Sequence, residues 1–161
     1  MESTIQYPAT DNAGQMNDAL NDYRCEIVTS AAPREAFAKI ARVSEWWAKH
    51  FEGSAGELND TFTIRWGETF VTFLVTECEP QVRAEWTVTD CFLPWLSDKQ
   101  EWTGTKAVWQ ISQSDGSTRI SFAHIGLVSG IECYESCVKG WDQYVKGSLL
   151  AFLNDGTGSP G

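Results

Sequence analysis

An imidazole stands where the surrounding pattern predicts a hydrocarbon. In the segment FAHIGL at residues 122–127, His124 follows Ile120 and Phe122 on one face of an alternating strand. A buried imidazole needs partners for both ring nitrogens, because burial removes their hydrogen bonds to water. Three interpretations are open: a hydrogen-bonded pin between the strand and the following helix, a ligand-binding group, or a general base.

Base catalysis would require a second group of complementary chemistry close to His124. The nearest candidates in the sequence are Glu132 and Tyr134, at the start of the last predicted helix. Neither belongs to a recognised catalytic motif, and the sequence contains no GxSxG, no HExxH and no phosphate-binding glycine loop. His124 and Glu132 are therefore the candidate catalytic residues of a chain whose sequence does not establish that it is an enzyme.

Two of the five cysteines are only four residues apart. Cys133 and Cys137 would share one face of a helix, as in a metal or redox pair, but no second CxxC or HxxxH accompanies them. Cys133 would also lie near the helix N-terminus, where the helix dipole lowers a thiol pKa, so it is the best candidate nucleophile. We expect reduced thiols that pack in the core in preference to a reactive pair, and neither a metal nor a cofactor.

Eight tryptophans supply more indole than a core of this size needs for stability. Trp66, Trp109 and Trp141 could form flat apolar walls of a pocket or could pack in the core, since both environments use such side chains. Trp46 and Trp47 are adjacent on a predicted helix and therefore point in different directions. We expect Trp47 to pack inward and Trp46 to lie at the surface; the alternative is that both gate the mouth of a pocket.

Small residues repeat every seven positions along the last predicted helix, at Cys133, Gly140 and Gly147. Glycine within a helix costs about 1 kcal/mol relative to alanine, so the repeat indicates a steric requirement. That requirement is either a close contact between helix and sheet or an empty volume beside the helix.

Length and charge limit the class of protein. A chain of 161 residues fits one domain, and a net charge of −10 without any basic run argues against nucleic acid and anionic lipid as partners. No apolar stretch reaches the length of a membrane span, and the first twenty residues lack the layout of a secretory signal. We expect a cytoplasmic protein.

The elements that would position these side chains begin after residues 1–20, which show no sustained period and are expected to form a flexible tail. A strand at 23–30 precedes a short helix that begins at Pro33. A second helix is predicted at 45–51, with Ser44 as its cap.

Strand-like runs then follow in quick succession, separated by turn residues. The predicted strands are 61–66, 69–79, 82–93, 101–113 and 118–126. Connections this short predict antiparallel hairpins, in contrast to the long crossovers that parallel strands require.

The last element is the longest. Ser129 and Glu132 form a capping box and the NDG at 154–156 is a stop signal, so we expect a helix of about 25 residues. Its core-facing stripe is Tyr134, Val138, Trp141, Val145, Leu149 and Phe152. The order of elements predicts an α+β fold, in which a curved antiparallel sheet of six to seven strands grips the long C-terminal helix. We expect one domain at 21–156 and a flexible tail at 157–161.

Several of these segments resemble a known family. SEWW after the first helix, GELNDTF at the second strand, EWTGTKAVWQIS late in the sheet and CYESCVKGWDQYVKGSLLAFLNDG at the end are similar to the SRPBCC or START-like superfamily, which has the Bet v 1-like helix-grip fold. Within it, the chain is most similar to small bacterial proteins named after the activator of heat-shock protein 90 ATPase, often called polyketide-cyclase-like. The resemblance covers about residues 22–156.

The resemblance implies an elongated, mainly apolar cavity between sheet and helix. Members bind hydrophobic small molecules, some catalyse cyclisation or related chemistry, and others are co-chaperones. We therefore expect an apolar or aromatic small molecule as ligand, oriented by polar groups such as His124 and Tyr134. The alternatives are a cyclase or hydrolase acting in the same cavity and a stress-related co-chaperone. The candidate ligand-binding residues are Trp47, Trp66, Trp109, His124, Tyr134, Cys137 and Trp141.

Heat-shock protein 90 and a second copy of the chain are the two candidate protein partners. Heat-shock protein 90 is the less expected one, because the eukaryotic activators carry an additional N-terminal domain that contacts the chaperone, whereas this chain has about twenty residues there. A homodimer would be compatible with an outward-facing Trp46.

Overall fold

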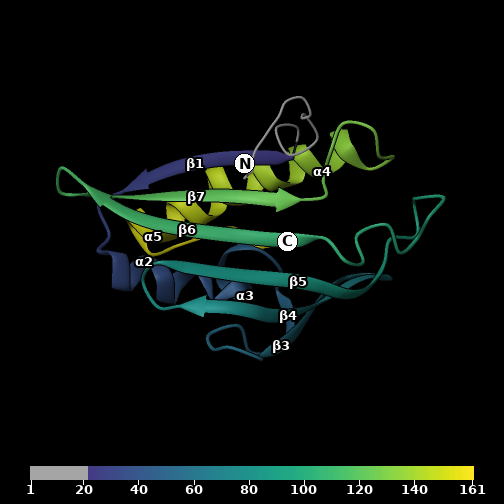
Figure 1. Ribbon diagram of the computed structural model, residues 1–161, viewed down its shortest axis with the longest axis horizontal. Coiled ribbons are helices and arrows are strands. Elements are labelled where there is room, and N and C mark those ends of the chain that lie inside the picture. The colour runs from purple at the N-terminus through teal and green to yellow at the C-terminus, as the bar shows by residue number, and fades with distance from the viewer. Residues whose placement is uncertain (1–21) are drawn as a thin grey trace, which may run out of the picture.

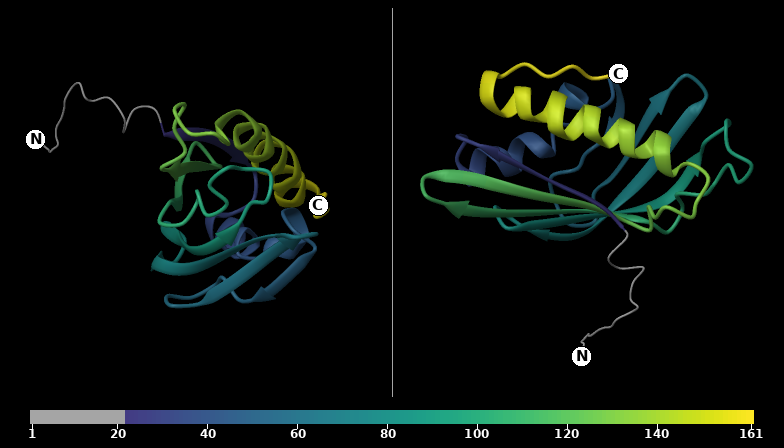
Figure 2. Two further views of the ribbon diagram at one scale, coloured as in Figure 1. Left: turned by 90° about the vertical axis from the view of Figure 1, so that its right-hand side faces the viewer. Right: turned by 90° about the horizontal axis from the view of Figure 1, so that it is seen from above.

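Seven antiparallel strands form a single sheet in the order β1-β7-β6-β5-β4-β3-β2, and the helices cover one face of it (Figure 1). The structure is a computed structural model that describes residues 22–161; the tail expected at 1–20 lies outside the described residues. The predicted α+β architecture, a curved sheet gripping a long C-terminal helix, is confirmed (Figure 2).

The strands follow the predicted alternation except at 101–105, which were predicted as strand and form turns, so that β6 begins at Lys106. They are β1 (Tyr23–Thr29), β2 (His50–Gly53), β3 (Thr61–Trp66), β4 (Thr69–Glu79), β5 (Arg83–Phe92), β6 (Lys106–Ser114) and β7 (Ser117–Ile125). The helices are α2 (Pro33–Ile40), α3 (Val43–Trp46), α4 (Tyr134–Trp141), the π-helical segment η1 (Asp142–Leu149) and α5 (Leu150–Asp155). The last three follow one another without a break as the long C-terminal helix.

The second predicted helix is wrong in its later half. Helix α3 ends at Trp46, and residues 50–53 form the edge strand β2. Phe51 pairs with Ile64 of β3, and its ring centroid lies 5.6 Å from that of Phe62. Pairing with β3 therefore outweighs the local helical pattern at these residues.

The start of the long helix also differs from the prediction. The capping box of Ser129 and Glu132 does not form, and α4 begins four residues later than a cap at 129 would place it. Glu132 Oε1 instead accepts a hydrogen bond of 2.9 Å from the backbone N–H of Ser97, in the loop between β5 and β6. The Glu101 carboxylate, from the same loop, accepts hydrogen bonds from the backbone amides of Glu132 and Cys133.

The end of the helix and its core-facing stripe match the sequence pattern. Gly156 has a φ of 82°, the left-handed conformation that glycine adopts at a helix C-terminus. Four members of the stripe are buried, and Tyr134 and Val138 are partly buried. The four buried members are Trp141, Val145, Leu149 and Phe152.

The expected surface position of Trp46 is wrong. Its side chain is fully buried, and its indole N–H donates to the carbonyl oxygen of Ile40 at 3.0 Å. The ring stacks on that of Trp47 at a centroid distance of 5.8 Å. The two neighbours are both buried because the sheet and the long helix enclose α3 and the segment after it. Because Trp46 is buried, it is not available for the dimer contact that an outward-facing ring would have allowed.

The middle of the helix grip is a packed aromatic core. Trp109 lies at its centre, with ring centroids 5.7 Å from Trp46, 5.4 Å from Trp86 and 4.4 Å from Phe122. These side chains fill the space where the resemblance implies the middle of an elongated cavity. Any sizeable cavity must therefore lie toward an end of the grip.

Residues 157–161, expected as a flexible tail, run back beside the long helix (Figure 2). The amide of Gly161 donates to the carbonyl of Trp47 at 2.9 Å, and the amide of Lys49 donates to the carbonyl of Gly161 at 3.1 Å. The amide of Ser159 donates to Oγ of Ser148 at 2.6 Å. This segment thus contacts both the helix and the residues that follow α3.

Candidate functional site: an aromatic cavity at one end of the helix grip

A cavity of about 250 Å³ lies between the first half of the long helix and the end of the sheet where β3 turns into β4. Five of the eight tryptophans of the chain line it. The lining residues are Trp47, Trp66, Thr69, Val71, Leu93, Trp95, Trp102, Ser136, Cys137, Gly140, Trp141 and Tyr144. We call this space the aromatic cavity.

One wall of the aromatic cavity is a face of the long helix. Cys137, Gly140, Trp141 and Tyr144 are spaced at three, four and seven residues from the first, so they lie on one side of the helix. A Cβ built on Gly140 would meet no heavy atom within 4 Å. Gly140 is therefore the member of the small-residue repeat that borders an empty volume, whereas Gly147 is exposed.

The other walls are formed by stacked and tilted aromatic rings. Trp47 is central, with ring centroids 4.8 Å from Trp141 and 5.8 Å from Trp66. Trp102 stacks on Trp141 at 6.0 Å, and Tyr144 stacks on Trp66 at 6.3 Å. Rings in such arrangements attract one another beyond their area burial, so they form a continuous aromatic band around the cavity.

An unpaired donor lies in this band. Nε1 of Trp66 is buried and has no hydrogen-bond partner among residues 22–161. A buried N–H without a partner costs about 1–3 kcal/mol. Gly161 packs closely against Trp66 and the hydroxyl of Tyr144, so the C-terminal segment covers this part of the band.

His124 lies behind the cavity wall and does not line the cavity. Its Nδ1 accepts a hydrogen bond of 2.9 Å from Nε1 of Trp141. Because an indole N–H can only donate, Nδ1 carries no proton, and the ring proton is on Nε2. Nε2 lies 2.9 Å from Oγ1 of Thr105 and donates to it, while that hydroxyl donates to the carbonyl of Trp102 at 2.6 Å.

The electrostatics of His124 follow from this burial. Desolvation lowers the pKa of the imidazole to about 3, so the ring is neutral at pH 7. Both nitrogens are hydrogen-bonded, and the ring contacts Trp102 edge-on at 4.6 Å. His124 therefore connects β7 to α4 and contacts two tryptophans of the cavity wall, Trp141 and Trp102.

The structure brings together four of the predicted ligand-binding residues: Trp47, Trp66, Cys137 and Trp141 line the aromatic cavity. Trp109 is fully buried in the central core, and Tyr134 packs at the edge of that core. Neither contributes to the cavity wall, and the same is true of His124. The carboxylate of Glu132, the other catalytic candidate, is held by the Ser97 amide.

The sequence prediction missed several wall residues for identifiable reasons. Tyr144 lies seven residues after Cys137, so the helical period could have revealed it. Leu93 and Trp95 belong to the irregular stretch between β5 and β6, where no period indicates direction. Thr69 and Val71 begin β4, and only the fold places that end of the strand beside the helix.

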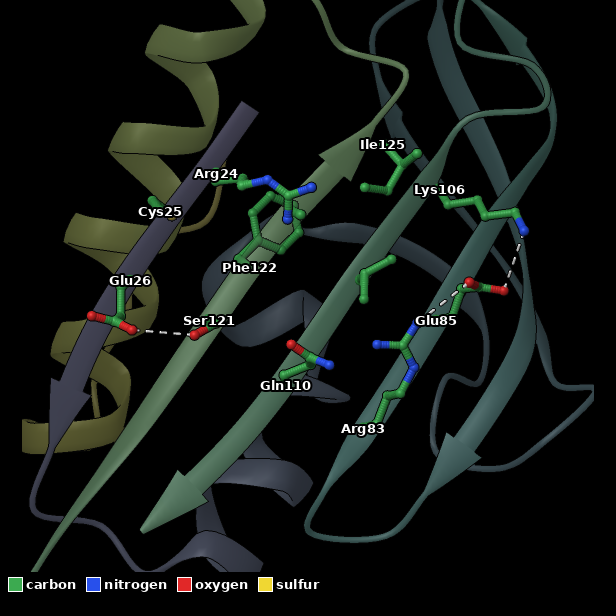
Figure 3. A pocket seen from close by; sticks show the side chains of 12 residues that line it. Arg24, Cys25, Glu26, Arg83, Glu85, Lys106, Gln110, Ser121, Phe122 and Ile125 are labelled. Carbon is green, nitrogen blue, oxygen red and sulfur yellow. Dashed lines mark hydrogen bonds and ion pairs between the residues drawn. The ribbon is translucent and has the colours of Figure 1, made fainter. Parts of the chain in front are cut away.

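A second, larger hollow of about 790 Å³ lies on the opposite face of the sheet (Figure 3). The charged side chains at its floor form ion pairs with one another. Glu85 is 7% exposed and lies 3.8 Å from Nη2 of Arg83 and 3.6 Å from Nζ of Lys106. Across the hollow, Ser121 donates to Glu26. The charged side chains in this lining contrast with the mainly apolar walls expected of a small-molecule pocket.

Residues 22–161 contain no cluster of three or more histidine, cysteine or acidic residues arranged to hold a metal ion. No helix in this part of the chain combines the length and hydropathy that a membrane span requires.

Known structures share this architecture. No protein-family model matches the sequence, and no curated protein matches it. The Aha1 dimer from Colwellia psychrerythraea, solved in solution, is 18% identical, with 85% of this chain and 98% of that chain covered and a TM-score of 0.69. DynU16, a putative protein in the dynemicin biosynthetic locus, is 15% identical over 86% of this chain and 49% of that chain, with a TM-score of 0.63.

CalU16 from Micromonospora echinospora is 12% identical, with 76% of this chain and 70% of that chain covered and a TM-score of 0.57. At such identities the likeness concerns the fold. A seven-stranded antiparallel sheet, short helices after β1 and a long C-terminal helix are the elements of the helix-grip fold. The chain therefore has the helix-grip fold, which it shares with the Aha1 dimer and the other solved structures named above.

Proposed function

We propose that the protein binds a small aromatic molecule in the aromatic cavity. The observation that carries the proposal is the gathering of five tryptophans around one space of about 250 Å³. Pockets for drug-sized ligands span about 300–1,000 Å³, so this space favours a molecule of one or two fused rings over a long lipid chain.

The ligand would carry a hydrogen-bond acceptor. Trp66 contributes a buried N–H without a partner among residues 22–161. A carbonyl oxygen that displaces Gly161 from the indole and accepts from this donor would offset the cost of leaving it unpaired. The proposed class is therefore a small aromatic ketone or a molecule of similar polarity.

A cyclase or hydrolase acting in the same cavity is the second candidate, but His124 does not favour it. A general base needs a nitrogen that can reach the substrate, whereas both nitrogens of His124 are hydrogen-bonded behind the wall.

A co-chaperone role is the third candidate. It would be favoured by an apolar patch on the outer face of the sheet, and that face carries paired charges such as Arg83, Glu85 and Lys106. Similarity to an Aha1 dimer is the remaining support for this role and for a homodimer. A cytoplasmic location agrees with five free cysteines, because reducing compartments keep thiols unpaired.

The test is calorimetric titration of the full-length protein with 1-indanone, a bicyclic aromatic ketone, and with indane, which lacks the carbonyl. We expect a dissociation constant on the order of 100 μM for 1-indanone and weaker binding of indane. Gly140→Leu should fill the cavity and weaken binding roughly tenfold or more. Gly147→Leu is the matched control, since that glycine is exposed on the same helix and has open space around it. Equal affinity of the two leucine variants would contradict the proposal.

A further inference from the structure

Cys137 lies in the wall of the aromatic cavity, one helical turn after Cys133. Cys137 is 8% exposed and Cys133 is 1% exposed, and only Cys137 borders the space that a ligand would enter. Nε1 of Trp102 donates to Sγ of Cys133 at 3.3 Å. The two thiols and this indole thus form one buried polar cluster at the start of the long helix.

The cluster favours a thiolate at Cys137. A hydrogen bond from the Cys133 thiol lowers the pKa of Cys137, and Trp102 and Ser136 contribute in the same direction, whereas burial and the charge of Glu101 oppose them. The pKa of Cys133 is raised, first by the same hydrogen bond and then by burial. Cys133 remains the nucleophile expected from its place near the helix N-terminus, but it does not line the aromatic cavity, so Cys137 is the thiol that a ligand there would meet.

The helix itself adds to this effect. Cys137 lies in the first turn of the long helix, and the partial positive charge of a helix N-terminus stabilises a nearby thiolate. Cys25 and Cys78 are half-buried and lie outside the aromatic cavity, and burial raises the pKa of both. The chain therefore contains its own reference thiols for a comparison of reactivity.

We propose that Cys137 is a nucleophile that captures electrophilic aromatic molecules, specifically α,β-unsaturated carbonyl compounds, inside the aromatic cavity. The choice of an aromatic carbonyl compound rests on the proposed function. In the reaction, the Cys137 thiolate forms a carbon–sulfur bond to the β-carbon, and the carbon–carbon π bond opens toward the carbonyl. The resulting enolate takes a proton from water at the α-carbon, so the product is a neutral thioether and no oxidant or reductant is required.

The cavity would give this reaction its selectivity. An aromatic band on several sides concentrates flat apolar molecules beside the sulfur. Charged or strongly hydrated electrophiles would have to lose water to enter, which costs free energy. Selectivity for aromatic electrophiles distinguishes this site from an exposed cysteine.

The experiment treats the reduced full-length protein with a substoichiometric amount of N-phenylmaleimide and measures the modification of each cysteine by peptide mass spectrometry. We expect Cys137 to react roughly tenfold or more faster than Cys25 and Cys78, although it is the least accessible of the three. Faster or equal modification of Cys25 or Cys78 would overturn the proposal.

Two variants test the role of the cluster. Cys133→Ala should slow the modification of Cys137, because the hydrogen bond to its sulfur is lost, and Cys133→Ser should restore part of the rate, because a hydroxyl also donates. Equal rates in the alanine and serine variants, both at the wild-type level, would contradict a donor role for Cys133. Cys137→Ser identifies the modified residue and should leave the modification of Cys25 and Cys78 unchanged.

N-phenylsuccinimide, the saturated analogue, separates this inference from the proposed function. If the analogue binds and slows modification of Cys137 but not of Cys25, both proposals are supported. If it binds and Cys137 stays unreactive toward the maleimide, the nucleophile is refuted and ligand binding stands. If Cys137 reacts fastest and the analogue gives neither binding nor protection, the nucleophile stands and the proposed function is refuted.

Discussion

Trp141 donates its indole N–H to Nδ1 of His124 at 2.9 Å, so a wall residue of the aromatic cavity is held by a histidine buried behind it. The same imidazole donates to Thr105, whose hydroxyl binds the carbonyl of Trp102. The imidazole also contacts the Trp102 ring edge-on, with centroids 4.6 Å apart, so one neutral side chain touches two rings of the cavity wall. This relationship connects the stability of the core with the shape of the site.

The stability of the protein should depend on pH through His124. Its pKa is about 3 in the folded protein and 6.5 in the reference state, so the unfolded chain binds the proton first as the pH falls. The stabilisation is complete above pH 6.5 and is lost progressively between pH 6.5 and pH 3. At pH 5 this residue should lower the free energy of unfolding by about 2 kcal/mol relative to pH 7.

Urea unfolding at pH 7 and pH 5 measures this loss. His124→Gln should remove this part of the pH dependence, while the control His50→Gln, at the exposed second histidine, should retain it. In the wild type, NMR of the imidazole nitrogens should show the neutral form with the proton on Nε2 at both pH values. A charged His124 in the folded protein at pH 5 would refute this explanation.

Trp141→Phe should be strongly destabilising. The variant leaves Nδ1 of His124 without a partner and removes packing next to Trp47 and Trp102. We expect a loss of about 2–4 kcal/mol in the free energy of unfolding, together with weaker binding of 1-indanone. Trp95→Phe is the control, because Trp95 is 54% exposed and should change stability by less than about 0.5 kcal/mol. Similar losses in the two variants would contradict the role of the hydrogen bond.

Two glycine-to-alanine substitutions should have opposite effects. Gly140→Ala should stabilise the protein by about 0.5–1 kcal/mol, because alanine favours the helix and its methyl group meets open space. Gly126→Ala should destabilise it by about 1–3 kcal/mol, since Gly126 has a φ of 106° and a Cβ there would lie 2.6 Å from Cγ2 of Thr105. Thermal unfolding of both variants checks the signs, and a destabilising Gly140→Ala would mean that this side of the helix is tightly packed.

Glu101→Gln should make Cys137 more reactive. The negative charge of Glu101 raises the pKa of Cys137, so its removal should lower that pKa and speed the reaction with N-phenylmaleimide roughly two- to fivefold at pH 7. The two amides of Glu132 and Cys133 donate to different oxygens of Glu101, so the single glutamine oxygen can keep one of these hydrogen bonds and its NH2 group cannot accept the other. A slower or unchanged rate would show that this charge does not act on the thiol. Glu132→Gln is the control.

The sequence predicted the sheet well because alternation and turn residues are local signals. The bounds predicted for β3 and β4, with the turn at Gly67-Glu68 between them, match the structure. Local signals failed where a distant partner decided the outcome. Phe51 lies in β2, where it pairs with Ile64, and Glu132 does not cap the helix but accepts a hydrogen bond from the amide of Ser97.

The candidate site was predicted only in part, for a similar reason. The helical period brings Cys137 and Trp141 to one wall, and the small-residue repeat indicates an empty volume at Gly140. The position of His124 at the end of a buried stripe was clear from alternation, but its two partners come from a loop and from the long helix. Which side of a packed ring faces an empty space depends on rotamers, and spacing in a sequence does not specify rotamers.

The central claim is that the aromatic cavity takes a small aromatic ligand, and the indole N–H signals of the eight tryptophans test it most directly. A ¹H–¹⁵N spectrum recorded during titration with 1-indanone should shift the signals of the five that line the cavity, Trp47, Trp66, Trp95, Trp102 and Trp141. The signals of Trp46, Trp86 and Trp109 should stay in place, because these residues belong to the packed core. The Trp66 signal should move downfield with 1-indanone and not with indane. Shifts distributed over both groups, or none at saturating 1-indanone, would contradict the account.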